Sequence, residues 1–334
     1  MQKRVTRFPR GVHHGQRWLW LLLILGSTVI SHAQPLSVHV VPQESGTPMT
    51  LLGIHFPTQE VGWAVGAAGT ILHTTDGGTT WSSVRRRTNV ILTAVTFTDE
   101  IHGWIVGQNG TILATRDAGR TWRPQISGTN VPLYGIFFLN PKEGWVVGGR
   151  GTILHTHDGG LNWVDQSSGT TADLFDAHFV DSHVGWAVGA LGTILVTHDG
   201  GENWQLQHPN NPATFFSVAF HDTMTGWVIG TQGAMFYTLN GGRSWIDRTL
   251  PCGAPCVKPP DLVQIVFPSN RVGWIVGERG TLLSSSDAGL TWQAHEPVAP
   301  YALYGLSFPA PLRGWAVGDH GTIVQITGTS GSAP

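Results

Sequence analysis

The sequence is poor in charge, in tyrosine and in cysteine. Of its 334 residues, 12% are charged, four are tyrosine and two are cysteine. Two cysteines cannot supply the several cross-links of a small disulfide scaffold, and without a second Cys or His pair at ligand spacing they are only a weak signal for a structural zinc site. Helical periodicity is also missing, while glycine is abundant at 44 residues. These features favour a globular all-β protein.

A repeated Gly-Trp pair organises the chain. It begins at Gly62, Gly103, Gly144, Gly185, Gly226, Gly273 and Gly314. Successive pairs lie 41 residues apart, except that the fifth and sixth are separated by 47. One fixed period with one insertion is typical of a propeller, a solenoid or an array.

Each period contains four short segments with strand composition. In the third repeat they span residues 133–139, 145–148, 152–157 and 162–166. Four strands per repeat predict a propeller blade, with the sequence V-G-x-x-G-T forming a tight hairpin between the second and third strands. We therefore predict an all-β, seven-bladed β-propeller of four-stranded antiparallel blades over residues 34–327, with repeats starting near residues 51, 92, 133, 174, 215, 262 and 303.

A second motif follows the third segment of six repeats and has the form S/T-x-D-x-G-x-T/S-W. Its acidic or amide position is Asp76, Asp117, Asp158, Asp199, Asn240 and Asp287. Asp and Asn favour turns because their side chains accept hydrogen bonds from nearby backbone N–H groups. The motif resembles the Asp-box of sialidases and several non-catalytic propellers. We interpret these six residues as structural, and the tryptophans of both motifs as core.

Residues 1–33 are predicted to be an export signal. A basic start precedes an apolar run from Trp18 to Ile30, and Ser31-His32-Ala33 has the pattern of a cleavage site. The protein is then expected in a periplasm, a thylakoid lumen or the medium, and the alternative is an uncleaved helical anchor. Cleavage would leave 14 basic and 21 acidic residues, a net charge of about −7, which argues against nucleic acid as a partner.

The seventh repeat lacks its fourth strand and its turn motif. Residues 36–41 form an apparent strand before the first complete repeat. We predict that this N-terminal strand completes the last blade, because an open ring would leave exposed strand edges. Residues 328–334 are then expected to be a flexible tail.

The insertion between the fifth and sixth repeats holds both cysteines. Cys252 and Cys256 lie in a Pro-rich loop, and in an exported protein a disulfide between them is the favoured interpretation. A metal site is the alternative.

Connections in a four-stranded meander alternate between the two faces of the ring. The hairpins and the blade-to-blade links therefore share the face opposite the turn motifs, and this face varies most between repeats. It is expected to carry a basic set that binds carboxylate or phosphate groups of a partner: Arg85, Arg86, Arg87, Arg150 and Arg279. The alternative is that these charges are simply solvated.

No enzyme site stands out. A sialidase needs a tyrosine nucleophile, and none of Tyr134, Tyr237, Tyr301 and Tyr304 is distinguished as one. A glycosidase needs two facing carboxylates, and the sequence does not place Asp176, Glu278, Glu296 and Asp319 within reach of one another. His155 and His157 lie on one strand face but lack an evident third ligand, so we predict no catalytic residue, no metal and no cofactor.

The whole pattern, L-x-x-I-x-F followed by G-W-x-V-G-x-x-G-T-I-L-x-T-x-D-G-G-x-x-W, resembles the photosystem II assembly and stability factors, a family of luminal propellers. The resemblance spans residues 51–326. It implies a non-catalytic, monomeric scaffold that binds a protein partner, in that family a reaction-centre subunit, partly through an arginine patch. The alternative class is a glycan-binding or glycan-hydrolysing propeller.

Overall fold

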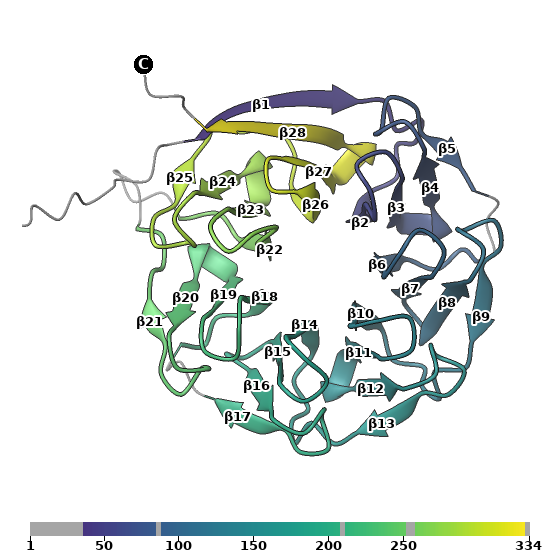
Figure 1. Ribbon diagram of the computed structural model, residues 1–334, viewed down its shortest axis with the longest axis vertical. Coiled ribbons are helices and arrows are strands. Elements are labelled where there is room, and N and C mark those ends of the chain that lie inside the picture. The colour runs from purple at the N-terminus through teal and green to yellow at the C-terminus, as the bar shows by residue number, and fades with distance from the viewer. Residues whose placement is uncertain (1–35, 85–87, 208–210, 252–257, 331–334) are drawn as a thin grey trace, which may run out of the picture. The chain divides into compact units, whose positions relative to one another are not determined.

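The computed structural model describes residues 36–84, 88–207, 211–251 and 258–330. Seven four-stranded antiparallel sheets are arranged as blades of one ring (Figure 1). The seven-bladed all-β prediction is therefore confirmed. Within this described part of the chain, no helix has the length and apolar character needed to cross a membrane.

The first six blades each use four consecutive strands. Blade 1 comprises β2 (Leu51–His55), β3 (Gly62–Gly66), β4 (Ile71–Thr74) and β5 (Ser82–Ser83), and blade 2 comprises β6 (Leu92–Phe97), β7 (Gly103–Gly107), β8 (Thr111–Thr115) and β9 (Arg123–Gln125). Blade 3 comprises β10 (Leu133–Phe138), β11 (Gly144–Gly148), β12 (Ile153–Thr156) and β13 (Val164–Gln166), and blade 4 comprises β14 (Leu174–Phe179), β15 (Gly185–Gly189), β16 (Ile194–Thr197) and β17 (Gln205–Gln207). Blade 5 comprises β18 (Phe215–Phe220), β19 (Gly226–Gly230), β20 (Met235–Thr238) and β21 (Ile246–Asp247), and blade 6 comprises β22 (Leu262–Val266), β23 (Gly273–Gly277), β24 (Leu282–Ser285) and β25 (Gln293–Ala294).

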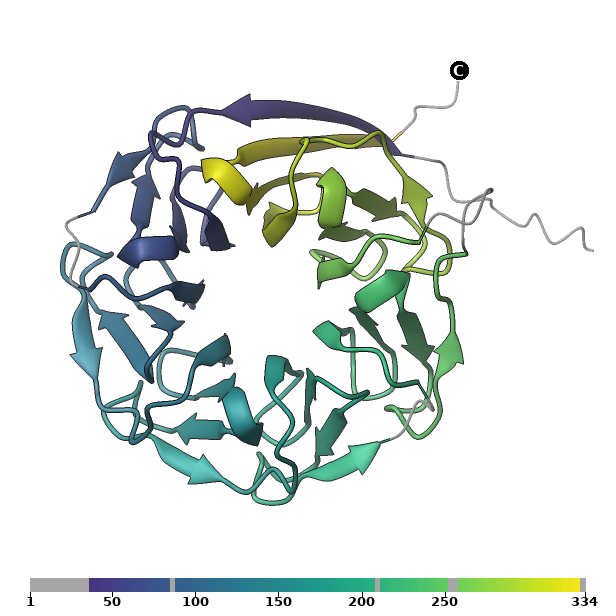
Figure 2. The same cartoon turned by 180° about the vertical axis from the view of Figure 1, so that it is seen from behind.

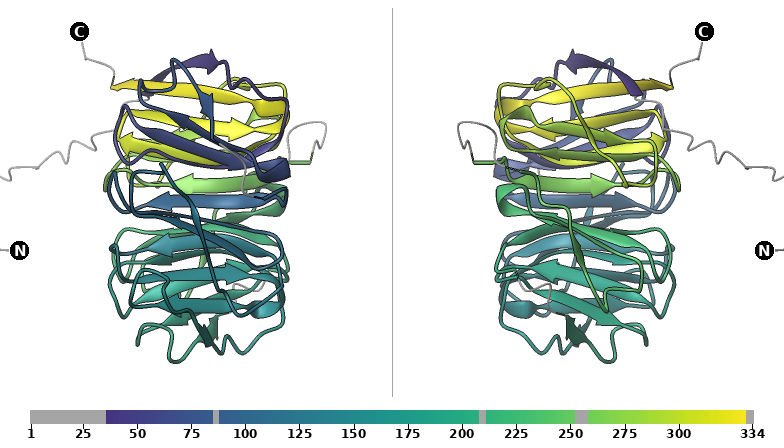
Figure 3. Two further views of the ribbon diagram at one scale, coloured as in Figure 1. Left: turned by 90° about the vertical axis from the view of Figure 1, so that its right-hand side faces the viewer. Right: turned by 90° about the vertical axis from the view of Figure 1, so that its left-hand side faces the viewer.

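Blade 7 joins the two ends of the described chain. It comprises β26 (Leu303–Ala310), β27 (Arg313–Gly318), β28 (Ile323–Ser330) and β1 (Leu36–Gln43). Strand β1 pairs antiparallel with β28 along its whole length, from Leu36 opposite Ser330 to Gln43 opposite Ile323 (Figure 3). Closure by the N-terminal strand is confirmed. The predicted tail, however, begins too early: residues 328–330 are strand, because β1 provides them with backbone partners.

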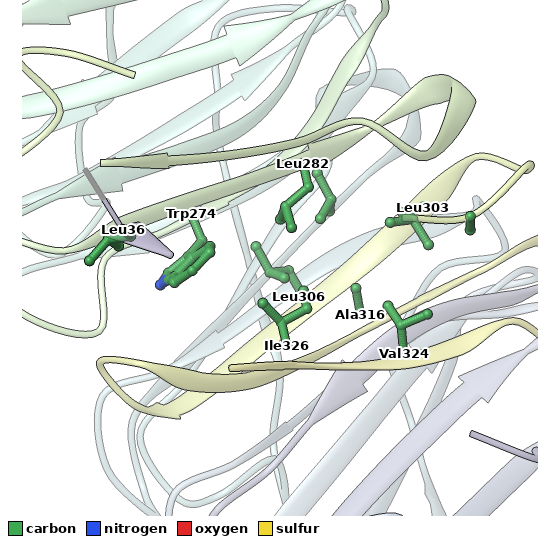
Figure 4. Close-up of a cluster of buried hydrophobic side chains, with 10 residues drawn as sticks. Leu36, Trp274, Leu282, Leu303, Leu306, Ala316, Val324 and Ile326 are labelled. Carbon is green, nitrogen blue, oxygen red and sulfur yellow. The ribbon is translucent and has the colours of Figure 1, made fainter. Parts of the chain in front are cut away.

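Tryptophans of the Gly-Trp pairs fill the spaces between blades. All seven are at most 2% exposed: Trp63, Trp104, Trp145, Trp186, Trp227, Trp274 and Trp315. Figure 4 shows one such interface, where Trp274 of blade 6 packs in a cluster with Leu306 and Ile326 of blade 7 and with Leu36 of the closing strand. The core is thus a circular series of interfaces between blades. The prediction that these tryptophans are core residues is confirmed.

The hairpin between the second and third strands contains a left-handed pair of residues. In blade 3, Arg150 has φ +57° and Gly151 has φ +72°, and Thr152 N–H donates to Gly149 O at 3.2 Å. Two left-handed central residues define a type I′ turn, whose twist suits a hairpin. Five of these turns are short 3₁₀ segments, seen as coils in Figure 2: η1 (Ala67–Gly69), η2 (Gly149–Gly151), η3 (Thr231–Gly233), η4 (Glu278–Gly280) and η5 (Asp319–Gly321).

The turn motif forms a closed hydrogen-bond network in each of the six blades that carry it. In blade 1, Thr80 N–H donates to Asp76 Oδ1 at 2.9 Å and the Thr80 hydroxyl donates to Oδ2 at 2.7 Å. Gly78 N–H donates to the Thr74 hydroxyl at 2.9 Å. The backbone N–H that the carboxylate accepts is thus four residues further along the chain. These bonds lower the pKa of the Asp76 carboxyl.

Candidate partner-binding face

The two faces of the ring are built from different connections. The motif turns lie beside the links between first and second strands, as when Gly77 N–H donates to Glu60 O at 2.9 Å. On the other face, the hairpins lie beside the blade-to-blade links, as when Gly110 N–H donates to Val131 O at 2.9 Å. We call these the motif face and the hairpin face. The alternation expected from a meander is therefore present.

Each inner strand is bulged at its second residue, near the hairpin face. In blade 3 the register shifts between Leu133, which pairs with Gly148, and Gly135, which pairs with Val147. The same shift occurs in all seven inner strands, β2, β6, β10, β14, β18, β22 and β26. A bulge re-aims a side chain out of the regular alternation. These seven strands are the ones nearest the central axis (Figure 1). Their bulged residues therefore encircle the axis near the hairpin face.

Aromatic side chains occupy this ring in three successive blades. The ring centroid of Phe175 lies 5.2 Å from that of Tyr134 and 5.6 Å from that of Phe216. All three side chains are partly exposed. We call Tyr134, Phe175 and Phe216 the aromatic arc. Sequence reasoning considered Tyr134 only as a possible nucleophile. It missed the arc because it looked for features that the blades share, whereas the arc depends on residues that differ between blades.

Tyr304 occupies the bulged position of blade 7 and is bound to an acidic hairpin. Its hydroxyl donates to Asp319 Oδ2 at 3.0 Å, while the Thr50 hydroxyl donates to Asp319 Oδ1 at 3.0 Å. Burial, this hydrogen bond and the negative charges of Asp319 and Glu278 raise the pKa of Tyr304 to about 12. The raised pKa keeps the Tyr304 hydroxyl protonated at neutral pH, so it donates to Asp319 and ties the inner strand of blade 7 to the hairpin of the same blade.

Asp176 is committed to an interface between blades. Its Oδ2 accepts hydrogen bonds from the Ser217 hydroxyl at 2.8 Å and from Val218 N–H at 3.1 Å, both in blade 5. Its Oδ1 accepts from Ala177 N–H at 2.9 Å. Burial raises the pKa of this carboxyl to about 6 despite these bonds. The carboxylate therefore ties blade 4 to blade 5.

The structure places two of the predicted arginines on the hairpin face but in separate blades. Arg150 is at the tip of the blade 3 hairpin and Arg279 at the tip of the blade 6 hairpin, where its Nη2 donates to Lys258 O at 2.9 Å. Arg85, Arg86 and Arg87 lie outside the described residues, as do Cys252, Cys256 and the predicted signal. Arg150 and Arg279 are three blades apart and do not form one cluster.

The structure brings a third potential metal ligand to His155 and His157, which the sequence analysis did not find. His155 and His157 of blade 3 meet Glu143, which precedes β11, and the three side chains can offer ligand atoms within 4.8 Å of one another. The sequence did not reveal Glu143 as the third ligand, because it precedes β11 whereas His155 is in β12. The two come together only when these strands pair. Burial, aided by the nearby His157, lowers the pKa of His155 to about 4.

A second network that the sequence analysis missed joins neighbouring blades. Gln125 Nε2 of blade 2 donates to Gly159 O of blade 3 at 3.0 Å, and Gln125 Oε1 accepts from Trp163 Nε1 at 3.1 Å. Trp104 Nε1 donates to the same Gly159 O at 3.1 Å. The amide contact recurs with Gln43, Gln166 and Gln207. Its signal was available, since these glutamines share the repeat period.

Seven blades in a closed ring, six of them with an Asp-box turn, and a partly apolar hairpin face define a β-propeller of the class that presents loops on a scaffold. Comparison with known families gives the particular group. The family model described as photosynthesis system II assembly factor YCF48 matches residues 81–168 and 162–255, which together make up just over half of the chain. The chain belongs to this family.

Solved structures agree on the fold. A structure described as YCF48 bound to D1 peptide has a TM-score of 0.72 at 22% identity, covering 88% of this chain and 97% of that one. YCF48 from Cyanidioschyzon merolae has a TM-score of 0.70 at 21% identity, with coverage of 86% and 98%. A streptogramin B lyase has a TM-score of 0.74 at only 12% identity, with coverage of 90% and 100%. The search of curated proteins returned no match.

Proposed function

We propose that this protein is a non-enzymatic assembly factor that holds a polypeptide segment of a membrane-complex subunit against its hairpin face. Membership of the assembly-factor family supports the kind of task, and the relative described as bound to D1 peptide supports a polypeptide as ligand. Export as a monomer, through the segment ending near Ala33, is part of the proposal.

The aromatic arc is the single observation that carries the choice of face. Tyr134, Phe175 and Phe216 are adjacent across three blades, partly exposed, and held by bulges that recur around the ring. Large aromatics with partial exposure are the side chains most enriched where proteins bind proteins. Arg150 and Arg279, at hairpin tips of this face, would add contacts to carboxylate groups of the partner. The run Arg85–Arg87, which lies outside the described residues, is proposed to add to these contacts.

A pull-down from host membranes tests this function, with residues 33–334 as bait because they form one compact unit. In the test variant, Tyr134, Phe175 and Phe216 are all replaced by Thr, the residue that blade 2 has at this position as Thr93. In the control, Val164 and Leu206, which are exposed on outer strands, are replaced by Ser. Capture of one membrane-complex subunit should fall at least tenfold in the test variant alone.

Equal capture by the test variant would refute the aromatic arc as the binding surface. A third bait with Glu at residues 85, 86 and 87 measures the arginine contribution separately. Recovery of a bound or cleaved oligosaccharide in place of a polypeptide would refute the assembly-factor function.

A further inference from the structure

The Glu143, His155 and His157 side chains converge at the outer rim of blade 3, on the motif face. The Glu143 Oε1 atom lies 3.7 Å from His155 Nε2 and 3.5 Å from His157 Nδ1. Three elements supply them: the link before β11, the strand β12, and the residue that follows it. Such convergence of one carboxylate and two imidazoles is not required by the fold, because no other blade has all three.

We propose that these three residues form a binding site for a divalent transition-metal ion of the zinc type. Zinc is bound by imidazole nitrogen at about 2.0–2.1 Å and by carboxylate oxygen at about 2.0–2.2 Å, in tetrahedral geometry. Ligand atoms in such a tetrahedron are about 3.3–3.5 Å apart. The two measured separations are close to this value, so small side-chain movements would complete the shell.

The state of His155 is independent support. Its side chain is buried with 7% exposure, and its Nε2 atom has no hydrogen-bond partner among the described residues. A buried polar atom without a partner is costly. An ion at the meeting point of the three side chains would provide the missing partner for this nitrogen.

Packing fixes the direction of the His155 ring. It stacks on Trp145 with ring centroids 4.4 Å apart and an interplanar angle of 7°. His157 is largely exposed, so its ring is free to turn toward an ion. A hollow of about 570 Å³ adjoins the two imidazoles and is also lined by Asp165 and Glu202. This hollow leaves room for water or another ligand at a fourth position, and its carboxylates favour a cation.

One contact limits the expected affinity. Gln166 Nε2 lies 3.2 Å from His155 Nδ1 and also donates to Gly200 O at 3.0 Å. Donation from this amide to Nδ1 leaves the ring proton on Nε2, facing Glu143. Metal binding at Nε2 must move that proton to Nδ1 and break the contact with Gln166. Since outer contacts of a ligating histidine change metal affinity about 10–100-fold, we expect Zn²⁺ to bind about 10–100-fold more weakly than it would without this contact.

The other blades provide a matched control. In blade 1, His73 stacks on Trp63 with centroids 4.0 Å apart, as His155 does on Trp145. The positions equivalent to Glu143 and His157 are Val61 and Thr75 there, so His73 has neither partner. Blade 5 has Tyr237 stacked on Trp227, which makes His155→Tyr a replacement that the fold already uses.

Isothermal titration of Zn²⁺ into tag-free residues 33–334, with Cys252 and Cys256 replaced by Ser, tests the site. One ion per chain should bind, and Glu143→Gln, His157→Ala and His155→Tyr should each weaken binding at least tenfold, whereas His73→Ala should not. Co²⁺ in place of Zn²⁺ should show the visible absorption of a tetrahedral ion, and His157→Ala should abolish it. No stoichiometric binding at 100 μM Zn²⁺, or equal binding by all variants, would overturn the proposal.

Discussion

Gln43 Nε2 donates a hydrogen bond to Gly77 O at 3.1 Å, and so connects the N-terminal strand to the turn motif of blade 1. Gln43 Oε1 also accepts from Trp81 Nε1 at 3.2 Å. The same pair of bonds joins Gln125 to blade 3. Closing the ring therefore uses the same contact that joins ordinary neighbours, and the closing strand is chemically a fourth strand like the others.

Replacing Gln43 by Ala should lower the free energy of unfolding by about 1–2 kcal/mol, because Trp81 Nε1 loses its acceptor. Gly77 O would still accept from Trp315 Nε1 at 3.2 Å. Urea unfolding measures the change, with Glu44→Ala as the exposed control. Removing residues 34–43 should lower the melting temperature far more, and an unchanged melting temperature would contradict closure by β1.

Two buried tryptophans differ in whether their indole N–H has a partner. Trp145 Nε1 donates to Gly200 O at 3.1 Å, while Trp227 Nε1 is buried without a partner in the described residues. Both Trp→Phe changes remove similar apolar surface, but only the change at Trp145 loses a hydrogen bond. Chemical denaturation should show Trp145→Phe to be more destabilising than Trp227→Phe by about 1 kcal/mol. Equal losses would mean that the indole bond contributes nothing.

The motif turns predict a graded response to substitution. Asp199→Ala removes the acceptor for Asn203 N–H, which lies 2.9 Å from Asp199 Oδ1. Asp199→Asn should be milder, because Asn240 already fills this position in blade 5 and accepts from Ser244 N–H at 2.9 Å. We expect Asp199→Ala to cost about 1 kcal/mol by thermal unfolding. A larger loss for Asp199→Asn than for Asp199→Ala would show that charge, rather than the accepted bond, matters.

Asp176 predicts a dependence of stability on pH. Its pKa is raised from 3.8 to about 6 by burial, so between these values the folded protein binds more protons than the unfolded chain. The contribution of this carboxyl to the free energy of unfolding should therefore rise as pH falls from about 7 to about 4, by about 2 kcal/mol. Asp176→Ser, which copies Ser217 of blade 5, should remove that contribution. If wild type and variant change in parallel with pH, Asp176 has no such shift.

The sequence predicted the ring because the fold repeats. Three signals in the sequence each pointed to one structure. The period of 41 residues predicted the blades, the glycines predicted the turns, and the unfinished seventh repeat predicted closure by the N-terminal strand. Gln43 even falls in phase with Gln125, two periods later, which marks β1 as a fourth strand.

The sites were harder to predict because they depend on differences between blades. Glu143 meets His155 only after β11 and β12 have paired, and Tyr134 meets Phe175 only after two blades have packed. Arg150 and Arg279 share the hairpin face, as the sequence predicted, but they are three blades apart, and that separation follows only from the order of the blades around the ring. Equivalent positions in a ring share a face without being neighbours.

Site-specific photo-crosslinking tests most directly the claim that the hairpin face binds the partner. Leu191, at the tip of the blade 4 hairpin, is 82% exposed, and Leu161, in the blade 3 motif turn on the opposite face, is 66% exposed. A photoreactive residue placed at either position in residues 33–334 disturbs no packing. On irradiation with host membranes, we predict a crosslink to one membrane-complex subunit from position 191 and none from position 161. A crosslink from position 161 alone would contradict the account.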